Sequence, residues 1–216
     1  MSDLVTLRAP NGLEAEAYRS LRTNLLAAKG DVRALLVASP EPGAGAAECA
    51  CNLAVACAQA GLRVTLVDGD LRDPAVHVWF GMSNDAGLAD AIVAQEPPQD
   101  SEGPVEGLSV VTAGRVTGMA ADLLARSAAA DALAVVREAS DLMLVVAPPV
   151  LSASDAATLA RNMDAVLLVV ASGKTRRKDA AAAREVFDHA GVPVLGVVLT
   201  GVDPEDASLP YFEAGK

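Results

Sequence analysis

The stretch SPEPGAGAAECACNLAVACAQAG, residues 39–61, combines a glycine loop with a helical pattern. The backbone N–H groups of such a loop, together with the N-terminus of the following helix, form a cradle for phosphate oxygens. Gly43 and Gly45 supply this backbone part. Nucleotide chemistry also needs a lysine for the outer phosphates and a hydroxyl group for magnesium. Ala46 and Ala47 stand at the positions of these two side chains.

Glu48 comes next and places a carboxylate in the first turn of the predicted helix. An acid there interacts favourably with the helix dipole, by about 0.3–1 kcal/mol, and repels a polyphosphate. Phosphoryl transfer depends almost entirely on positioning and charge stabilisation, so the loss of these groups affects catalysis most. We therefore expect a helix start that needs no bound anion.

The elements that must position this loop follow a regular alternation of apolar runs and helical patterns. Strands are predicted at 33–39, 63–69, 108–113, 142–147, 165–171 and 193–199, and helices at 13–28, 46–60, 86–94, 119–138, 152–162 and 175–190. Continuous β-branched runs separated by helices are typical of a parallel sheet that is covered on both faces. The sequence thus predicts one α/β domain over 1–216, a doubly wound, mainly parallel sheet flanked by helices and preceded by one extra helix.

In open parallel sheets, ligands bind beyond the carboxyl ends of the strands. Four segments are predicted to meet there: 39–48, 68–74, 147–152 and 200–203. The glycine loop belongs to the first of them.

Composition and charge indicate what kind of core the protein has and which binding partners they exclude. The chain is 52% apolar and only 3% aromatic, which suits a core of Val, Leu and Ala, and its formal charge of -11 argues against a nucleic-acid surface. No apolar run approaches the ~20 residues of a membrane span, and the polar start does not resemble a signal peptide. We expect a cytoplasmic protein that reaches the inner face of the membrane only through a partner.

Two further stretches have structural interpretations. Cys49, Cys51 and Cys57 share one predicted helix with no histidine nearby, so we interpret them as buried apolar residues and expect no metal. The acidic stretch 95–107 is predicted to be a solvated loop.

Several motifs in order along the chain resemble the cytoplasmic domain of bacterial tyrosine kinases, which belong to the deviant P-loop ATPases. They are EAYRSLRTNL (16–25), the glycine loop, VTLVDGDLRDPAVHVWFG (64–81), GLADAIVA (87–94), DLMLVVAPPVLSASDA (141–156), VLLVVASGKTRR (166–177) and VLGVVLTGVD (194–203). The resemblance covers nearly the whole chain. It implies a P-loop NTPase fold and a role with membrane co-polymerases of capsule and exopolysaccharide export.

The sequence departs from the family pattern at four places. The lysine and hydroxyl positions of the loop, the Walker A motif, hold Ala46 and Ala47, and Val146 replaces an aspartate that would support magnesium. Thr200 stands where the family often presents an asparagine to adenine, and the C-terminal tyrosine cluster has shrunk to Tyr211 within the short tail 201–216. The resemblance therefore implies a degenerate nucleotide site that retains Gly43, Gly45, Asp68, Asp70, Arg72 and Thr200, with no catalytic residue and no cofactor.

Asp68 and Asp70 leave two interpretations open. In the family the matching carboxylates lie close to the metal and activate the hydroxyl group, so a surviving activity would use them with ATP and magnesium. The interpretation we favour is an acidic turn that is hydrogen-bonded to its own amides or to Arg72. The sequence SGKT at 172–175 lacks the spacing of a displaced phosphate loop, and GKTRRK at 173–178 is predicted to be a basic helix start on the surface.

Glu16, Arg19 and Arg22 match the pattern through which the family's kinase domains associate into rings. Steps of three along a helix place them on adjoining surface, where Glu16 pairs with Arg19 and the two arginines repel each other unless a neighbouring subunit supplies an acid. Taken alone, the pattern describes a solvated face. The resemblance makes 1–30 an oligomerisation region. His77 is interpreted as a packing or loop residue, and Trp79 and Phe80 as a packing segment that anchors this loop to the domain.

Three functions remain open from the sequence. The first is a pseudokinase that oligomerises, with itself or with an active paralogue, and regulates polysaccharide export through a membrane co-polymerase. The second is a weak ATP-dependent tyrosine autokinase or ATPase. The third, a partition or septum-placement ATPase, is disfavoured by the acidic charge and by the lack of a basic amphipathic C-terminal helix.

Overall fold

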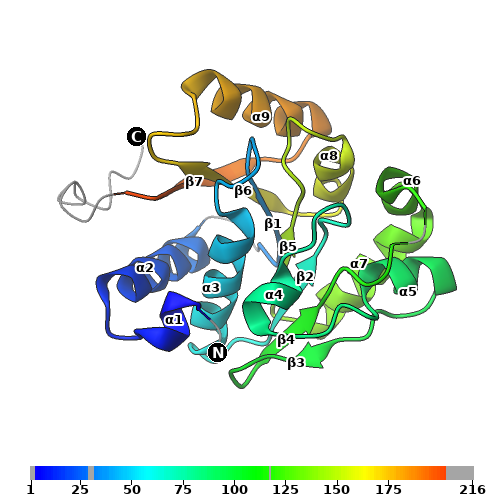
Figure 1. Ribbon diagram of the computed structural model, residues 1–216, viewed down its shortest axis with the longest axis horizontal. Helices are drawn as coiled ribbons and strands as arrows, with labels where there is room; N and C mark the ends of the chain where they lie inside the picture. Colours follow the sequence, from blue (N-terminus) through cyan, green and yellow to red (C-terminus); the bar gives the residue numbers. More distant parts are fainter. Residues whose placement is uncertain (1–2, 29–31, 117, 203–216) are drawn as a thin grey trace.

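A seven-stranded sheet with the order β3-β4-β2-β5-β1-β6-β7 forms the centre of the structure (Figure 1). The computed structural model describes residues 3–28, 32–116 and 118–202. The strands are β1 (Ala34–Ala38), β2 (Val64–Asp68), β3 (Ser101–Glu102), β4 (Leu108–Val111), β5 (Leu142–Val146), β6 (Ala165–Ala171) and β7 (Val194–Thr200). Among the described strands, the β3–β4 pairing alone is antiparallel. The predicted doubly wound, mainly parallel sheet is confirmed.

The apolar runs form strands because both faces of the sheet are covered. Every residue of β1, β2 and β5 is buried, which explains why these strands show no alternation of polar and apolar residues. β7 lies at one edge of the sheet, and there Val197 is 61% and Leu199 54% accessible.

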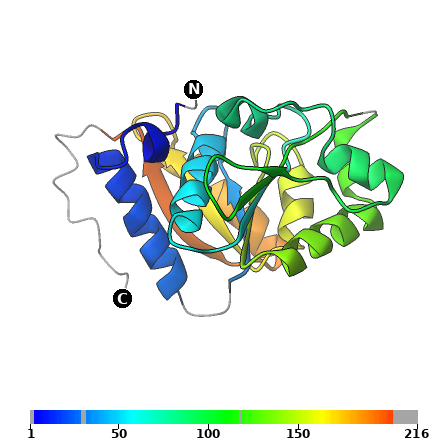
Figure 2. The same cartoon turned by 90° about the horizontal axis from the view of Figure 1, so that it is seen from below.

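Helices cover the two faces as separate layers (Figures 1 and 2). One layer packs on the first face: α1 (Val5–Arg8), α2 (Leu13–Ala27), α3 (Ala46–Ala58) and α4 (Val76–Phe80). The other layer consists of α5 (Leu88–Ala94), α6 (Ala120–Leu124), α7 (Ser127–Ala139), α8 (Asp155–Ala160) and α9 (Arg177–Ala190).

α3 is the central helix of the first layer. Eleven of its 13 residues are buried, and most of them are Ala, Cys or Val, small side chains that let the helix approach the sheet closely. The three cysteines are free and buried, as predicted, and burial raises the pKa of Cys49 and Cys57 to about 12. Their thiols therefore stay protonated and act as apolar side chains.

Four sequence-based predictions of elements need correction. The chain begins with two helices, α1 and α2, instead of one, because the single turn of α1 is too short to show a periodicity. α4 was not predicted either. The acidic stretch 95–107, predicted as loop, contains the two-residue strand β3.

The predicted helix 119–138 is divided into α6 and α7, with Arg126 in an extended conformation between them. Its apolar spacing continues unbroken from Leu124 to Ala128, so no local signal marks the break. Both halves contact α5, but α6 also packs on α8 while α7 also packs on β5, and this tertiary packing overrides the local pattern.

Candidate functional site

Four loops meet at the carboxyl ends of the strands, as the topology predicts. The amide of Gly69 donates to the Val146 carbonyl at 2.9 Å, which joins the loop after β2 to the end of β5. The amide of Val150 donates to the Ser39 carbonyl at 2.9 Å and so joins the loop after β5 to the glycine loop. The Thr200 hydroxyl, at the end of β7, donates to the Ala44 carbonyl at 2.8 Å.

The glycine loop has the backbone shape of a phosphate cradle. Gly43 and Gly45 have φ values of 73° and 86°, in the left-handed region that favours glycine. α3 begins directly after them, and the Gly45 carbonyl accepts the first hydrogen bond of the helix from the Cys49 amide. The backbone part of the site is therefore present.

The side chains at this helix start do not fit a magnesium nucleotide. Ala46 is only 8% exposed and its methyl group packs into the core, Ala47 packs beside it, and Val146 is 3% exposed. Burial, followed by the nearby charge of Glu14, raises the pKa of Glu48 above its usual value. In the described part of the chain, no cluster of three His, Cys, Asp or Glu side chains could hold a metal ion.

A lysine nevertheless reaches the glycine loop from the turn between β6 and α9. The Lys174 ammonium donates to the carbonyls of Pro42 at 3.0 Å and Gly43 at 3.1 Å. Beside it, the Thr175 hydroxyl donates to the Glu41 carboxylate. The exposed position predicted for this basic segment is confirmed, but its contact with the loop was missed, because about 130 residues separate the partners in sequence.

Asp68 is fully buried and accepts only backbone amides among the described contacts. One carboxylate oxygen accepts from the amides of Ala75 at 3.0 Å and Val76 at 2.9 Å, and the other accepts from Asp70 at 3.2 Å. The carboxylate thereby caps the start of α4 from a distance. Burial raises the pKa of Asp68 to about 7, although the three amide donors favour the charged form.

Asp70 has the same kind of environment. Its carboxylate accepts from the amides of Arg72 and Asp73, both at 3.1 Å, and burial raises the pKa of Asp70. The acidic turn that we favoured from the sequence, bonded to its own amides, is therefore what the structure contains.

The Arg72 guanidinium points to a residue that the sequence did not single out. It forms a bidentate pair with the buried Asp155, with distances of 2.6 and 3.1 Å, and so ties the loop after β2 to the start of α8. Asp155 lies 83 positions away. The one signal in the sequence that could have drawn attention to Asp155 is its position as an acidic residue in the first turn of a helix, α8.

Glu16, Arg19 and Arg22 lie on α2 beside a surface hollow of about 390 Å³. Arg19 pairs with Glu16 at 2.6 Å, as predicted, and also donates to the Pro10 carbonyl at 2.7 Å. Arg22 donates to the Ala56 carbonyl near the end of α3 at 3.0 Å. Both arginines therefore have acceptors within their own chain, and among the described contacts only those of Arg19 include a carboxylate.

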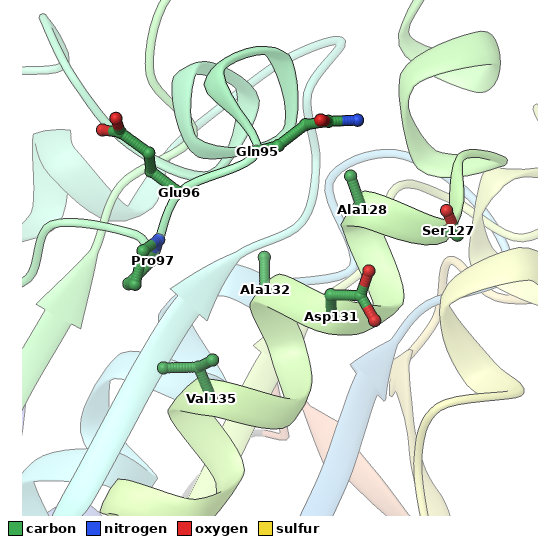
Figure 3. A pocket seen from close by; sticks show the side chains of 8 residues that line it. All are labelled: Gln95, Glu96, Pro97, Ser127, Ala128, Asp131, Ala132 and Val135. Atoms are coloured by element: carbon green, nitrogen blue, oxygen red, sulfur yellow. The ribbon is translucent and has the colours of Figure 1, made fainter.

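A second hollow, of about 280 Å³, lies between the end of α5 and α7 (Figure 3). Glu96 and Asp131 give it an acidic lining. It contains no residue of the glycine loop, and none of the residues assigned from the sequence to the nucleotide site or to oligomerisation lines it.

The packing segment on α4 is placed as predicted. Trp79 and Phe80 are half-buried against the layer that contains α3. His77 lies on the same short helix, and its buried Nδ1 has no hydrogen-bond partner among the described residues. Tyr211 and the tail from 203 onward lie outside the described residues. No helix within the described ranges is long and apolar enough to cross a membrane.

Known proteins resemble this chain in sequence and in fold. Residues 32–200 match the ParA family, described as NUBPL iron-transfer P-loop NTPase. Tyrosine-protein kinase YwqD of Bacillus subtilis is 32% identical over 203 residues, which cover 92% of this chain and 86% of that protein. Putative tyrosine-protein kinase CapB of Staphylococcus aureus is 30% identical over 220 residues, covering 100% of this chain and 96% of that protein.

Among solved structures, the kinase domain of Escherichia coli tyrosine kinase ETK superimposes with a TM-score of 0.87 at 28% identity. The match covers 92% of this chain and 80% of that chain. The family match, the two relatives and this superposition all include the glycine loop and the sheet that carries it. The chain belongs to the ParA-type P-loop NTPases and, within them, to the bacterial tyrosine-kinase family.

Proposed function

We propose that this chain is a non-catalytic member of its family, a pseudokinase that serves as a binding and regulatory component. The observation that carries the proposal is the helix start after the glycine loop, where the methyl groups of the buried Ala46 and the half-buried Ala47 replace the lysine and hydroxyl group and Glu48 adds negative charge. Without a cation at this point, the cradle offers a triphosphate only backbone dipoles. Phosphoryl transfer needs more charge stabilisation than these dipoles supply.

The family membership supports a place in capsule or exopolysaccharide synthesis and export. In this role the chain is cytoplasmic, and it sits at the inner face of the membrane when it binds a polysaccharide co-polymerase. Its other partners are further copies of itself or an active paralogue. Neither ATP nor magnesium is needed for such a role.

The α2 face is the surface we assign to self-association. Arg19 is 32% and Glu16 61% exposed in their side chains, so the pair remains accessible to a neighbouring chain although it is already formed. An exposed pair contributes about 0–1 kcal/mol within one chain, which leaves its charges available for a second partner.

Calorimetry with ATP and magnesium tests the lack of nucleotide binding. We expect no heat of binding at micromolar concentrations, because Ala46 replaces the lysine that would offset the charge of the triphosphate and the Lys174 ammonium is already bonded to the loop carbonyls. Ala46→Lys/Ala47→Thr restores the cation and the hydroxyl group and is the matched variant. Micromolar affinity of the unaltered chain, with ATP turnover, would overturn the proposal.

A weak autokinase or ATPase is the second candidate, and one observation favours it. Asp68 and Asp70 lie together at the carboxyl end of β2, the same edge of the sheet that carries the glycine loop, and Lys174 brings a cation to that loop from another element. Under this alternative, turnover disappears in Asp70→Asn. Under the pseudokinase proposal there is no turnover to lose.

Arg19→Ala/Arg22→Ala tests the assembly surface by light scattering. The unaltered chain is expected to gain mass with concentration above the 21.9 kDa of one copy, while the variant remains a monomer. Arg177→Ala/Lys178→Ala on α9 removes the same charge from another face and is expected to leave assembly intact. Equal masses of the Arg19→Ala/Arg22→Ala variant and the unaltered chain at every concentration would contradict the assignment.

A further inference from the structure

The glycine loop is bonded from outside by side chains of two other elements. Lys174 bonds to the carbonyls of Pro42 and Gly43, and the Thr200 hydroxyl bonds to the carbonyl of Ala44. Three consecutive carbonyls of the loop therefore each have a side-chain donor.

The segments that carry these donors are fixed by further hydrogen bonds. The amide of Ser172 donates to the Thr200 carbonyl at 2.8 Å, which ties the β6–α9 turn to the end of β7. The Thr175 hydroxyl bonds to Glu41, and it also accepts from the Ala171 amide at 2.9 Å. The turn is thus anchored to the sheet before it reaches the loop.

The loop is shaped to receive the lysine. A Cβ atom at Gly43 would lie 2.6 Å from the Lys174 ammonium nitrogen, so only glycine leaves room for this contact as well as for the positive φ. Thr200 also packs against Gly45, where a Cβ atom would lie 3.7 Å from its methyl group.

We propose that Lys174 and Thr200 form a strut that keeps the glycine loop folded without any bound ligand. In a nucleotide-binding loop, a phosphate group orders the amides from inside the cradle. Here a cation and a hydroxyl group order the carbonyls from outside it. The strut acts on the empty loop and therefore does not depend on the proposed lack of catalysis.

NMR relaxation of the nucleotide-free chain tests the strut, with backbone order parameters at Gly43, Ala44 and Gly45 as the readout. In the unaltered chain we expect values of about 0.85, as in rigid backbone, and a fall below about 0.6 in Lys174→Met/Thr200→Val. Valine keeps the branched shape that packs on Gly45, so the variant removes mainly the hydrogen bonds.

Lys178→Met is the matched control, because the side chain of this exposed lysine of α9 has no hydrogen bond or ion pair among the described residues. Its loop order parameters are expected to equal those of the unaltered chain. Unchanged order parameters in Lys174→Met/Thr200→Val, or a loop that is already below about 0.6 in the unaltered chain, would overturn the strut. Since no nucleotide is present, neither result depends on the calorimetry above.

Discussion

Asn52→Leu is expected to destabilise the protein by about 3 kcal/mol in urea unfolding. Asn52 is fully buried in α3, and its side-chain oxygen accepts from the Thr6 amide at 3.1 Å and the Thr6 hydroxyl at 2.9 Å. The Thr6 amide is one of the N–H groups at the start of α1 that find no partner inside their own helix. Leucine has a similar volume but leaves both donors buried without an acceptor, at a cost of about 1–3 kcal/mol each.

Thr6→Val gives the matched comparison for this prediction. It removes the hydroxyl group and keeps the amide bonded to Asn52, so a loss of only about 1 kcal/mol is expected. Exchange of the Thr6 amide should accelerate in Asn52→Leu and stay slow in Thr6→Val. If both variants unfold at the same urea concentration as the unaltered chain, Asn52 does not hold α1 on α3.

Asp68→Asn is expected to change how stability depends on pH. Burial raises the pKa of Asp68 to about 7 in the folded protein, from 3.8 in the unfolded chain. The folded state therefore keeps a proton that the unfolded state releases, and stability falls as the pH rises from about 4 to about 7. At 1.36 kcal/mol per pKa unit, the fall contributed by this residue reaches about 4 kcal/mol.

The test compares unfolding free energies at pH 4 and pH 8. Asparagine cannot ionise, so the variant should gain up to about 4 kcal/mol relative to the unaltered chain over this interval. Any constant cost of the amide group facing the Asp70 amide cancels in the difference. Asp73→Asn removes an equal charge from the exposed part of the same turn and should leave the profile nearly unchanged. Parallel profiles for Asp68→Asn and the unaltered chain would contradict the raised pKa.

The sequence was sufficient to predict the strands of the sheet, because strands that are buried on both faces consist of continuous apolar runs. Six strand predictions match observed strands to within about two residues at each end, and the edge strand β3 escaped because it is only two residues long. The break between α6 and α7 left no trace, since it depends on which neighbour each half meets. The spacing of apolar residues indicates which side of a segment is buried, but it does not indicate which other element covers that side.

The same limit applies to the candidate site. Gly43 and Gly45, Asp68 and Asp70 were placed correctly, because topology brings the ends of parallel strands together. Asp155 and Lys174 could not be found in this way. Asp155 pairs with the guanidinium group of Arg72, far away in the sequence, and Lys174 bonds to two backbone carbonyls. Every residue has a backbone carbonyl, so the sequence does not indicate which one a side chain will contact.

α3 is connected to other parts of the chain at three points along its length. The glycine loop precedes it, Asn52 at its middle accepts a hydrogen bond from α1, and the Ala56 carbonyl near its end accepts one from Arg22. At 1.5 Å per residue, its 13 residues make a rod of about 20 Å. A displacement of α2 by a neighbouring chain would act on α3 near its C-terminal end, while the glycine loop lies at its N-terminal end. The helix is thus a rigid connection between the α2 face and the glycine loop.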